Sequence, residues 1–270
     1  MERSRLRFLA PNLVTATSIV FGLMAVQAAV AGRPRASAWW VLYCVLADKL
    51  DGAIARLFKA SSAFGMQLDS LSDFLAFGVA PATVIYGFLS RRPELGWAEG
   101  PGLWMLRIVV VTHVVCAAAR LARFNIVADV QGSDRFFFGV PTTFAGGMLC
   151  ALFLTFLKYG DPSWQASEAT WDPRLLGTVR LDAGMRAVPL LMTLLALAMV
   201  STLRVPKLGR TRILPVDLWV VGNVLFAYTA GWARILPEWL AFGSLTYLIG
   251  SVIYHFASPA RHVKLPPVFE

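Results

Sequence analysis

Charged residues are scarce in this sequence. Only 15% of its 270 residues are Asp, Glu, Lys or Arg, whereas a soluble domain of this length carries about 25%. Hydrophobic residues make up 57% of the chain and gather in long runs. The low charge therefore argues against an ordinary soluble domain and points to a membrane protein.

Cysteine and histidine are also rare, with three residues of each. The cysteines Cys44, Cys116 and Cys150 all fall inside apolar runs, and their odd number argues against a disulfide framework. The histidines are scattered without the spacing of a zinc site, and we interpret His113 as a packing residue. Any metal site in this protein should therefore use oxygen ligands.

The apolar runs predict an all-α integral membrane protein with about eight transmembrane helices. Each run is near the ~20 residues that a helix needs to cross the hydrocarbon core. The expected spans are 12–30, 37–58, 66–89, 104–124, 138–157, 186–203, 215–231 and 238–257. We read the first as a retained helix rather than a signal peptide. Loops are short except 158–185, so we expect a single domain over 1–270.

The formal net charge of +9 is interpreted as a topology signal and not as a nucleic-acid footprint. In membrane proteins Lys and Arg gather on the cytoplasmic side and contact lipid headgroups. The basic start "MERSRLR" and the cluster "RVPKLGRTR" (204–212) fall on one side of the predicted bundle. The charge bias therefore predicts a protein of the cytoplasmic (inner) membrane with both termini in the cytoplasm.

Against this apolar background, the stretch "DKLDGAIARLFKASSAFGMQLDSLSD" (48–73) carries four aspartates. Asp48 and Asp51 lie about 60° apart around a helix, and Asp69 and Asp73 about 40° apart. The connection "FKASSAFG" is short, so the two helices should form an antiparallel hairpin. The carboxylate pairs are expected to face each other in the half of the membrane nearest the basic side.

Four carboxylates this close together repel one another unless a cation neutralises them. Oxygen ligands without Cys or His favour hard cations such as magnesium, manganese or calcium. Two such ions can clamp the two oxygens of a phosphoryl displacement. Gly52 would let a ligand approach the backbone closely, and Arg56 and Ser62 could bind phosphate or sugar oxygens.

Two other interpretations of these acids stay open at this point. An acidic residue inside a membrane can line an ion or proton pathway in a transporter. The acids could also form structural pairs with Lys49 and Arg56. Transporters often contain internal repeats, and no second copy of this acidic pattern occurs in the sequence, which favours the metal site.

The pattern Asp48-x-x-Asp51-Gly52-x-x-Ala55-Arg56, followed by eight residues and then Gly65-x-x-x-Asp69-x-x-x-Asp73, resembles the signature of the CDP-alcohol phosphotransferases. "PNLVT" at 11–15 resembles the segment that opens the first helix in this family. Members transfer a substituted phosphate from a CDP-linked donor to an alcohol and release CMP. The resemblance implies two divalent cations (Mg²⁺ or Mn²⁺), a homodimer and an active site in the cytoplasmic half of the bundle.

The resemblance also implies roles for individual residues. The expected metal ligands are Asp48, Asp51, Asp69 and Asp73, and Asp73 also matches the residue assigned as the general base. The expected nucleotide or diphosphate contacts are Asn12, Gly52, Arg56 and Ser62.

Three downstream stretches resemble the subfamily that uses CDP-diacylglycerol as donor and L-serine as acceptor. They are "FLAFGVAPA" (74–82), "ARLARFN" (119–125) and "FFFGVPTT" (136–143). Arg120, Arg123 and Asn125 are accordingly expected to bind the acceptor or a lipid phosphate. Arginines at a helix end also serve as topology anchors, and glycerol 3-phosphate, inositol phosphate and choline stay open as alternative acceptors.

Overall fold

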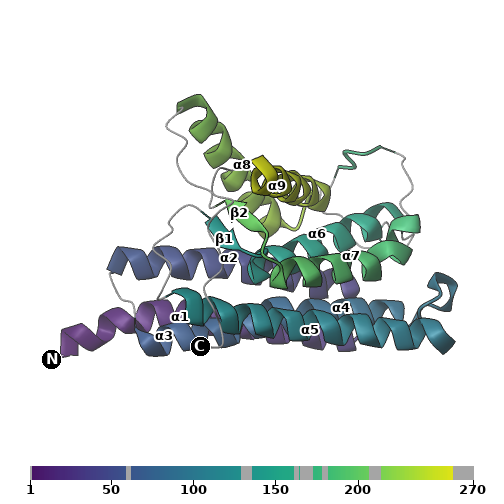
Figure 1. Cartoon of the computed structure of the whole chain (residues 1–270), viewed down its shortest axis with the longest axis horizontal. Coiled ribbons are helices and arrows are strands. Elements are labelled where there is room, and N and C mark those ends of the chain that lie inside the picture. The colour runs from purple at the N-terminus through teal and green to yellow at the C-terminus, as the bar shows by residue number, and fades with distance from the viewer. Residues whose placement is uncertain are drawn as a thin grey trace.

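The computed structural model describes residues 2–58, 62–128, 136–160, 164, 173–177, 182–206 and 214–257. Long helices dominate these residues (Figure 1). In chain order the elements are α1 (Glu2–Val30), α2 (Pro34–Phe58), α3 (Ala63–Asp73), the π-helix η1 (Phe74–Val79), α4 (Ala80–Leu89), the short 3₁₀ helix η2 (Pro93–Leu95), α5 (Gly100–Ala128), β1 (Phe136–Phe138), α6 (Thr142–Gly160), α7 (Asp182–Val200), β2 (Arg204–Pro206), α8 (Leu214–Ala233) and α9 (Pro237–Ala257).

The continuous rod made by α3, η1 and α4 is surrounded by α1, α2, α5 and α6, and α7 packs on α5 and α6. Helices α1 and α2 pack along each other, α5 packs on α7, and α6 contacts α2, α7 and α9. The interior of the bundle is apolar, with Trp39, Phe77 and Phe153 among its fully buried side chains. In a membrane, close van der Waals packing of such side chains helps hold the helices in one arrangement, because lipid tails are as apolar as the side chains themselves.

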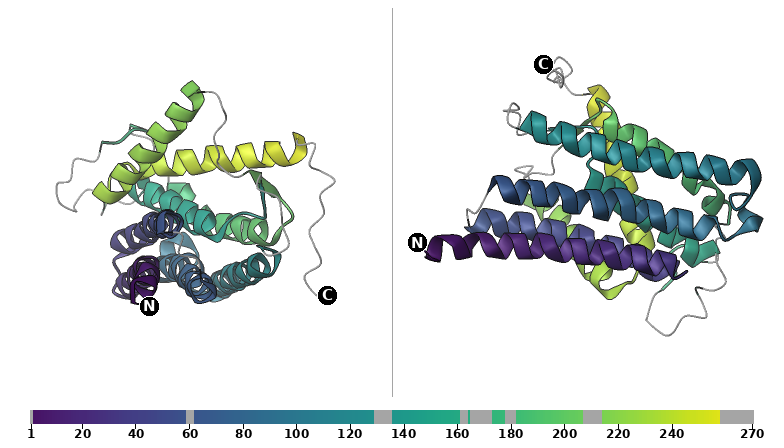
Figure 2. Two further views of the ribbon diagram at one scale, coloured as in Figure 1. Left: turned by 90° about the vertical axis from the view of Figure 1, so that its left-hand side faces the viewer. Right: turned by 90° about the horizontal axis from the view of Figure 1, so that it is seen from below.

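Helices α8 and α9 lie across one side of this bundle. In the left view of Figure 2, α1, α2 and α5 are seen end on, whereas α9 is seen from its side. Large apolar side chains on α9, such as Phe242, Ile253 and Phe256, are exposed. They suit contact with lipid, since a membrane protein turns apolar side chains outwards.

The described residues confirm an all-α membrane protein but not the count of eight spans. Six helical segments are long and apolar enough to cross a membrane: 12–30, 63–89, 100–126, 142–160, 183–200 and 237–257. Helix α2 is not among them, and it carries Asp48, Lys49 and Asp51. Helix α2, which carries two of the expected metal ligands, therefore departs from an ordinary apolar span.

The predicted span 66–89 differs from a regular helix at its centre. The segment Phe74–Val79 is a π-helix between α3 and α4, so it contains wider turns than those of an α-helix. Pro81 follows at the start of α4. Proline lacks a backbone N–H, and this disturbs the regular hydrogen-bond pattern upstream of it.

A small antiparallel sheet departs from the purely helical prediction. Phe136 pairs with Pro206, and Phe138 with Arg204, so the connection after α5 meets the connection after α7. The next residue, Gly139, has φ 73°, and a Cβ there would collide with the carbonyl oxygen of Met199. Because of this strand and turn, α6 begins at Thr142 and not at the predicted residue 138.

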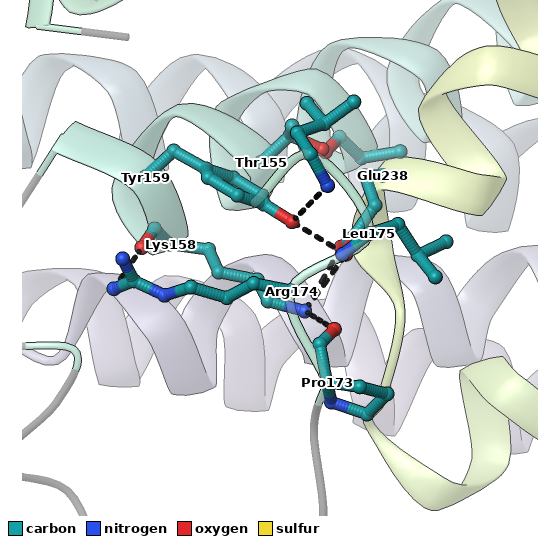
Figure 3. Close-up of polar contacts among 9 residues, drawn as sticks. Thr155, Lys158, Tyr159, Pro173, Arg174, Leu175 and Glu238 are labelled. Atoms are coloured by element: carbon teal, nitrogen blue, oxygen red, sulfur yellow. Dashed lines mark hydrogen bonds and ion pairs between the residues drawn. The ribbon is translucent and has the colours of Figure 1, made fainter. Parts of the chain in front are cut away.

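A buried ion pair joins the end of α6 to the start of α9. Lys158 Nζ lies 2.9 Å from Glu238 Oε1, and the two side chains are only 1% and 4% exposed. Figure 3 shows that Tyr159 and the backbone of Leu175 also point at this carboxylate, with distances to Oε1 of 2.9 and 3.2 Å. Lys158 donates a further bond to the carbonyl of Pro173. These partners offset the cost of burying both charges.

Replacing Glu238 with Gln is expected to lower the free energy of unfolding by about 3 kcal/mol or more, because it removes the carboxylate charge that is paired with the buried Lys158. Gln keeps an acceptor for Tyr159 and Leu175, so the loss reports the charge. Denaturant unfolding of the purified protein in detergent measures it. Adding Lys158→Met to the same variant should recover part of the stability. An unchanged unfolding curve for Glu238→Gln would contradict this account.

Candidate active site

Three of the four aspartates meet at one end of the helical hairpin. One carboxylate oxygen each of Asp48, Asp51 and Asp69 lies within 4.8 Å of the others. Asp48 and Asp51 lie on the last turns of α2, and Asp69 lies on α3. The antiparallel course of these two helices (Figure 1) brings the carboxylates to the same level of the bundle.

The cluster is shielded but not sealed. Asp51 is 8% exposed, whereas Asp48 and Asp69 are half-buried. Lys49 Nζ lies 3.5 Å from Asp48 Oδ2, yet the lysine side chain is 61% exposed. A pair so open to solvent contributes little stability, so Lys49 alone does not neutralise three acids. This makes purely structural pairing with Lys49 a poor explanation of the cluster.

Asp73 is set apart from the other three acids. It lies one turn after Asp69, at the last residue of α3, and it does not belong to the group whose oxygens lie within 4.8 Å. It interacts electrostatically with Asp48, Asp69 and the buried Arg120. Asp73 therefore borders the cluster, with a cation as its neighbour.

The structure adds Thr15 to the residues expected from the sequence. The Thr15 hydroxyl on α1 donates to Asp51 Oδ2 at 3.2 Å, and Ser72 donates to the carbonyl oxygen of Thr15 at 3.3 Å. Both Thr15 and Ser72 are buried. A hydrogen bond of this kind fixes the orientation of a carboxylate before any ligand binds. The stretch "PNLVT" could have indicated Thr15 as a site residue, because it ends on Thr15.

Replacing Thr15 with Val should weaken Mn²⁺ binding by about tenfold, the loss typical when a partner of a metal ligand is removed. Val has nearly the same shape and lacks the hydroxyl that orients Asp51. Thr17→Val is the matched control, because the Thr17 hydroxyl only bonds the Leu13 carbonyl of its own helix. A titration of Mn²⁺ followed by electron paramagnetic resonance would measure both variants. Equal affinity in the two would contradict a role for Thr15.

Two of the expected nucleotide contacts, Asn12 and Ser62, meet at the start of α3. Ser62 is the N-cap of this helix and accepts a bond from Gly65 N at 3.0 Å. A Cβ added to Gly65 would lie 3.1 Å from Ser62 Oγ and 3.3 Å from Asn12 Oδ1, so Asn12 of α1 reaches the same place. Gly52 adjoins Asp51 on α2. Arg56 belongs to α2 as well, but its side chain lies outside the described residues.

Arg120 and Asn125 connect α5 to its neighbours near the acids. Arg120 is 7% exposed, donates to Thr142 Oγ1 at 3.3 Å and has Asp73 as an electrostatic partner. Asn125 donates to Ser70 Oγ at 2.9 Å, and Ser70 follows Asp69 in α3. Arg120 is thus the downstream residue that places a positive charge beside the carboxylates.

Arg123 has different surroundings from Arg120. Its guanidinium group donates to four backbone carbonyls, those of Phe138, Met199, Val200 and Ser201, at 2.9 to 3.3 Å. It thereby joins the end of α7 to β1, where Gly139 leaves space for it. A cation at a helix C-terminus also complements the helix dipole. These contacts favour a structural role, and acceptor binding by Arg123 stays a prediction.

The donor set of the cluster fits a divalent cation. The three groups are carboxylates, and their mutual distances allow one ion to contact all three. The orientation of Asp51 by Thr15 is the arrangement expected around a metal ligand. Magnesium and manganese both accept such oxygens.

The chain is similar to proteins of one family along much of its length. The sequence profile described as CDP-alcohol phosphatidyltransferase matches residues 8–172. A protein of Helicobacter pylori named CDP-diacylglycerol–serine O-phosphatidyltransferase is 32% identical over 209 residues, which cover 76% of this chain and 75% of that protein.

Two further relatives match a shorter part of the chain. A protein of the same name from Mycobacterium tuberculosis is 31% identical over 159 residues, 57% of this chain and 52% of that protein. The archaetidylserine synthase of Methanothermobacter thermautotrophicus is 31% identical over 147 residues, 54% of this chain and 58% of that protein. The match thus spans about half the length of the mycobacterial relative.

Proposed function

Because the chain belongs to the CDP-alcohol phosphatidyltransferase family, we propose that it transfers the phosphatidyl group of CDP-diacylglycerol to the hydroxyl of L-serine. The products are phosphatidylserine and CMP. The observation that carries the proposal is the meeting of Asp48, Asp51 and Asp69 at one end of the bundle. The names of the relatives support serine as the acceptor.

The metal ligands in this proposal are Asp48, Asp51 and Asp69, together with Asp73 at the edge of the cluster. When divalent cations are bound, they supply charge neutralisation for the diphosphate of the donor. Asn12, Gly52, Arg56 and Ser62 bind the nucleotide or its diphosphate. The two acyl chains of the donor remain among lipids, while its cytidine occupies the cytoplasmic side.

Asp73 acts as the general base in the transfer. Its carboxylate accepts the proton of the serine hydroxyl while that oxygen forms a bond to the phosphorus nearer the lipid. The bond from this phosphorus to the CMP oxygen breaks, and CMP leaves with the electron pair. Arg120 interacts electrostatically with Asp73, and its guanidinium suits the serine carboxylate or the lipid phosphate. Asn125, which donates to Ser70 beside Asp69, orients the acceptor.

The cytoplasmic orientation also belongs to the proposal. In Figure 1, α2 ends and α3 begins at the end of the bundle at which α1 begins, and the sequence there is basic. Lys and Arg next to spans favour the cytoplasmic side. The termini and the active site are therefore assigned to the cytoplasmic face of the inner membrane, and the homodimer expected for the family stays a prediction.

An acceptor panel tests the function directly. The purified protein in detergent receives CDP-diacylglycerol, Mn²⁺ and one of L-serine, glycerol 3-phosphate, inositol phosphate or choline. CMP release with serine, accompanied by phosphatidylserine, is the expected result. CMP release with another acceptor only would reassign the alcohol. No CMP with any acceptor would contradict the enzyme proposal and leave an ion-coupled transporter as the alternative.

A further inference from the structure

The carbonyl group of Phe77 lacks its usual partner in the helix. In an α-helix this oxygen would accept a bond from the backbone N–H four residues later, and that residue is Pro81, which has none. Phe77 is fully buried. A buried carbonyl without a donor is costly, so this one favours a donor outside the α-helical register. The candidates are Ala82 N–H, five residues on in the π-helical register, and a side chain of a neighbouring helix.

His113 of α5 supplies such a side-chain donor. Its Nε2 lies 3.3 Å from the Phe77 oxygen, and the imidazole is 0% exposed. A carbonyl oxygen only accepts hydrogen bonds, so the contact requires the proton on Nε2. The ring thus offers the Phe77 oxygen a side-chain donor, which Pro81 does not.

The contact lies next to the candidate active site. Phe77 belongs to the π-helix Phe74–Val79, which begins directly after Asp73. In a helix, a register shift of one residue turns everything beyond it by about 100°. The hydrogen bonds that hold these wide turns therefore determine where Asp69 and Asp73 point.

The packing of α3 and α4 determines which of the two helices would rotate if the register of η1 changed. Seven residues of α4 are buried. In α3 only Ser72 is buried among the described residues, and the others are exposed or half-buried. On the other side of Phe77, a Cβ on Gly146 would lie 3.0 Å from the Phe77 backbone oxygen, so α6 leaves little room there. A change of register would consequently be taken up by α3 and its two aspartates.

We propose that His113 is a positioning residue for Asp69 and Asp73, because its bond to the Phe77 carbonyl holds the wide turns that join α3 to α4. The inference rests on the proposed function for the roles of the two aspartates. It concerns a histidine that contacts neither substrate nor metal and acts through the backbone of η1.

Two substitutions with side chains of similar length distinguish the loss of the hydrogen bond from the loss of packing at position 113. His113→Gln keeps an N–H at the distance of Nε2 from the backbone, and His113→Met fills a similar space without a donor. His113→Met is expected to weaken Mn²⁺ binding by about tenfold and to lower turnover by a similar factor, the loss seen when a partner of a metal site is removed. His113→Gln should stay near the wild-type values in both measurements.

The second test restores the missing backbone donor. Pro81→Ala restores a backbone N–H four residues after Phe77. The loss of Mn²⁺ affinity and turnover caused by His113→Met should therefore be smaller in the Pro81→Ala background. Mn²⁺ affinity by electron paramagnetic resonance, turnover at saturating substrate and thermal unfolding are measured for each protein. If His113→Met alone is not recovered folded, the double variant replaces it, and near wild-type Mn²⁺ affinity in that protein supports the proposal.

Three results would overturn the inference. The first is that His113→Met and His113→Gln bind Mn²⁺ with equal affinity. The second is that His113→Met lowers Mn²⁺ affinity and turnover as much in the Pro81→Ala background as alone. The third is that the double variant also fails to fold. The Mn²⁺ titration needs no turnover, so it tests His113 even if the acceptor panel releases no CMP. Failure of the proposed function and failure of this inference are therefore distinguished.

Discussion

Asp69→Asn is expected to abolish measurable Mn²⁺ binding and to reduce CMP release by about 10³-fold or more, which corresponds to about 4 kcal/mol of transition-state stabilisation. Asp69 is the member of the cluster that comes from α3, and the other two come from α2. Asn keeps the size of the side chain but removes its negative charge. A Mn²⁺ titration and a CMP release assay on the same preparation measure the two losses.

Glu94→Gln is the matched control for this experiment. Glu94 is also an acidic residue, but it lies in the short helix η2, with its side chain 64% exposed and 4.0 Å from Arg92. Its replacement should leave both measurements unchanged. Retention of Mn²⁺ affinity by Asp69→Asn would mean that the carboxylates do not hold the cation, and the mechanism would have to be abandoned.

Asp73→Asn is expected to lower turnover by about 10³-fold, within the range attributed to a general base, while Mn²⁺ affinity falls far less than in Asp69→Asn. The reason is geometric, since Asp73 lies outside the group of oxygens within 4.8 Å. An amide cannot accept the proton of the acceptor hydroxyl. Turnover at saturating substrate, compared with the Mn²⁺ titration, separates the two roles.

The comparison also identifies the alternative. If Asp73 is mainly a ligand, Mn²⁺ affinity and turnover will fall by the same factor. Near-normal turnover in Asp73→Asn would show that another group takes the proton. Thr15→Val is a useful reference here, because it disturbs the orientation of Asp51 and leaves every carboxylate in place.

The meeting of the acids was predictable because it depends on local rules. The helical repeat places Asp48 near Asp51, and the short connection to α3 brings Asp69 opposite them. The wide turns after Asp73 were less accessible. Pro81 indicates that the Phe77 carbonyl loses a partner, but the sequence alone does not reveal that His113 offers it a donor, because that pairing depends on how α5 packs.

Arg120 and Arg123 illustrate a second limit of sequence reasoning. Both were expected to bind the acceptor or a lipid phosphate, yet Arg120 interacts with Asp73 and Arg123 donates to carbonyls at the end of α7. The difference arises from Gly139, whose turn leaves room for the Arg123 guanidinium. Which carbonyls surround an arginine is a tertiary property that residue spacing does not determine.

The Lys158–Glu238 pair bears on where this chain can be divided. Lys158 lies inside the segment 8–172 that matches the family profile, whereas Glu238 lies well beyond it, on α9. A fragment that ends after residue 172 would contain the lysine without its counter-charge. The segment matched by the family profile should therefore be less stable alone than within the whole chain, because α9 contributes the Glu238 carboxylate to the end of α6.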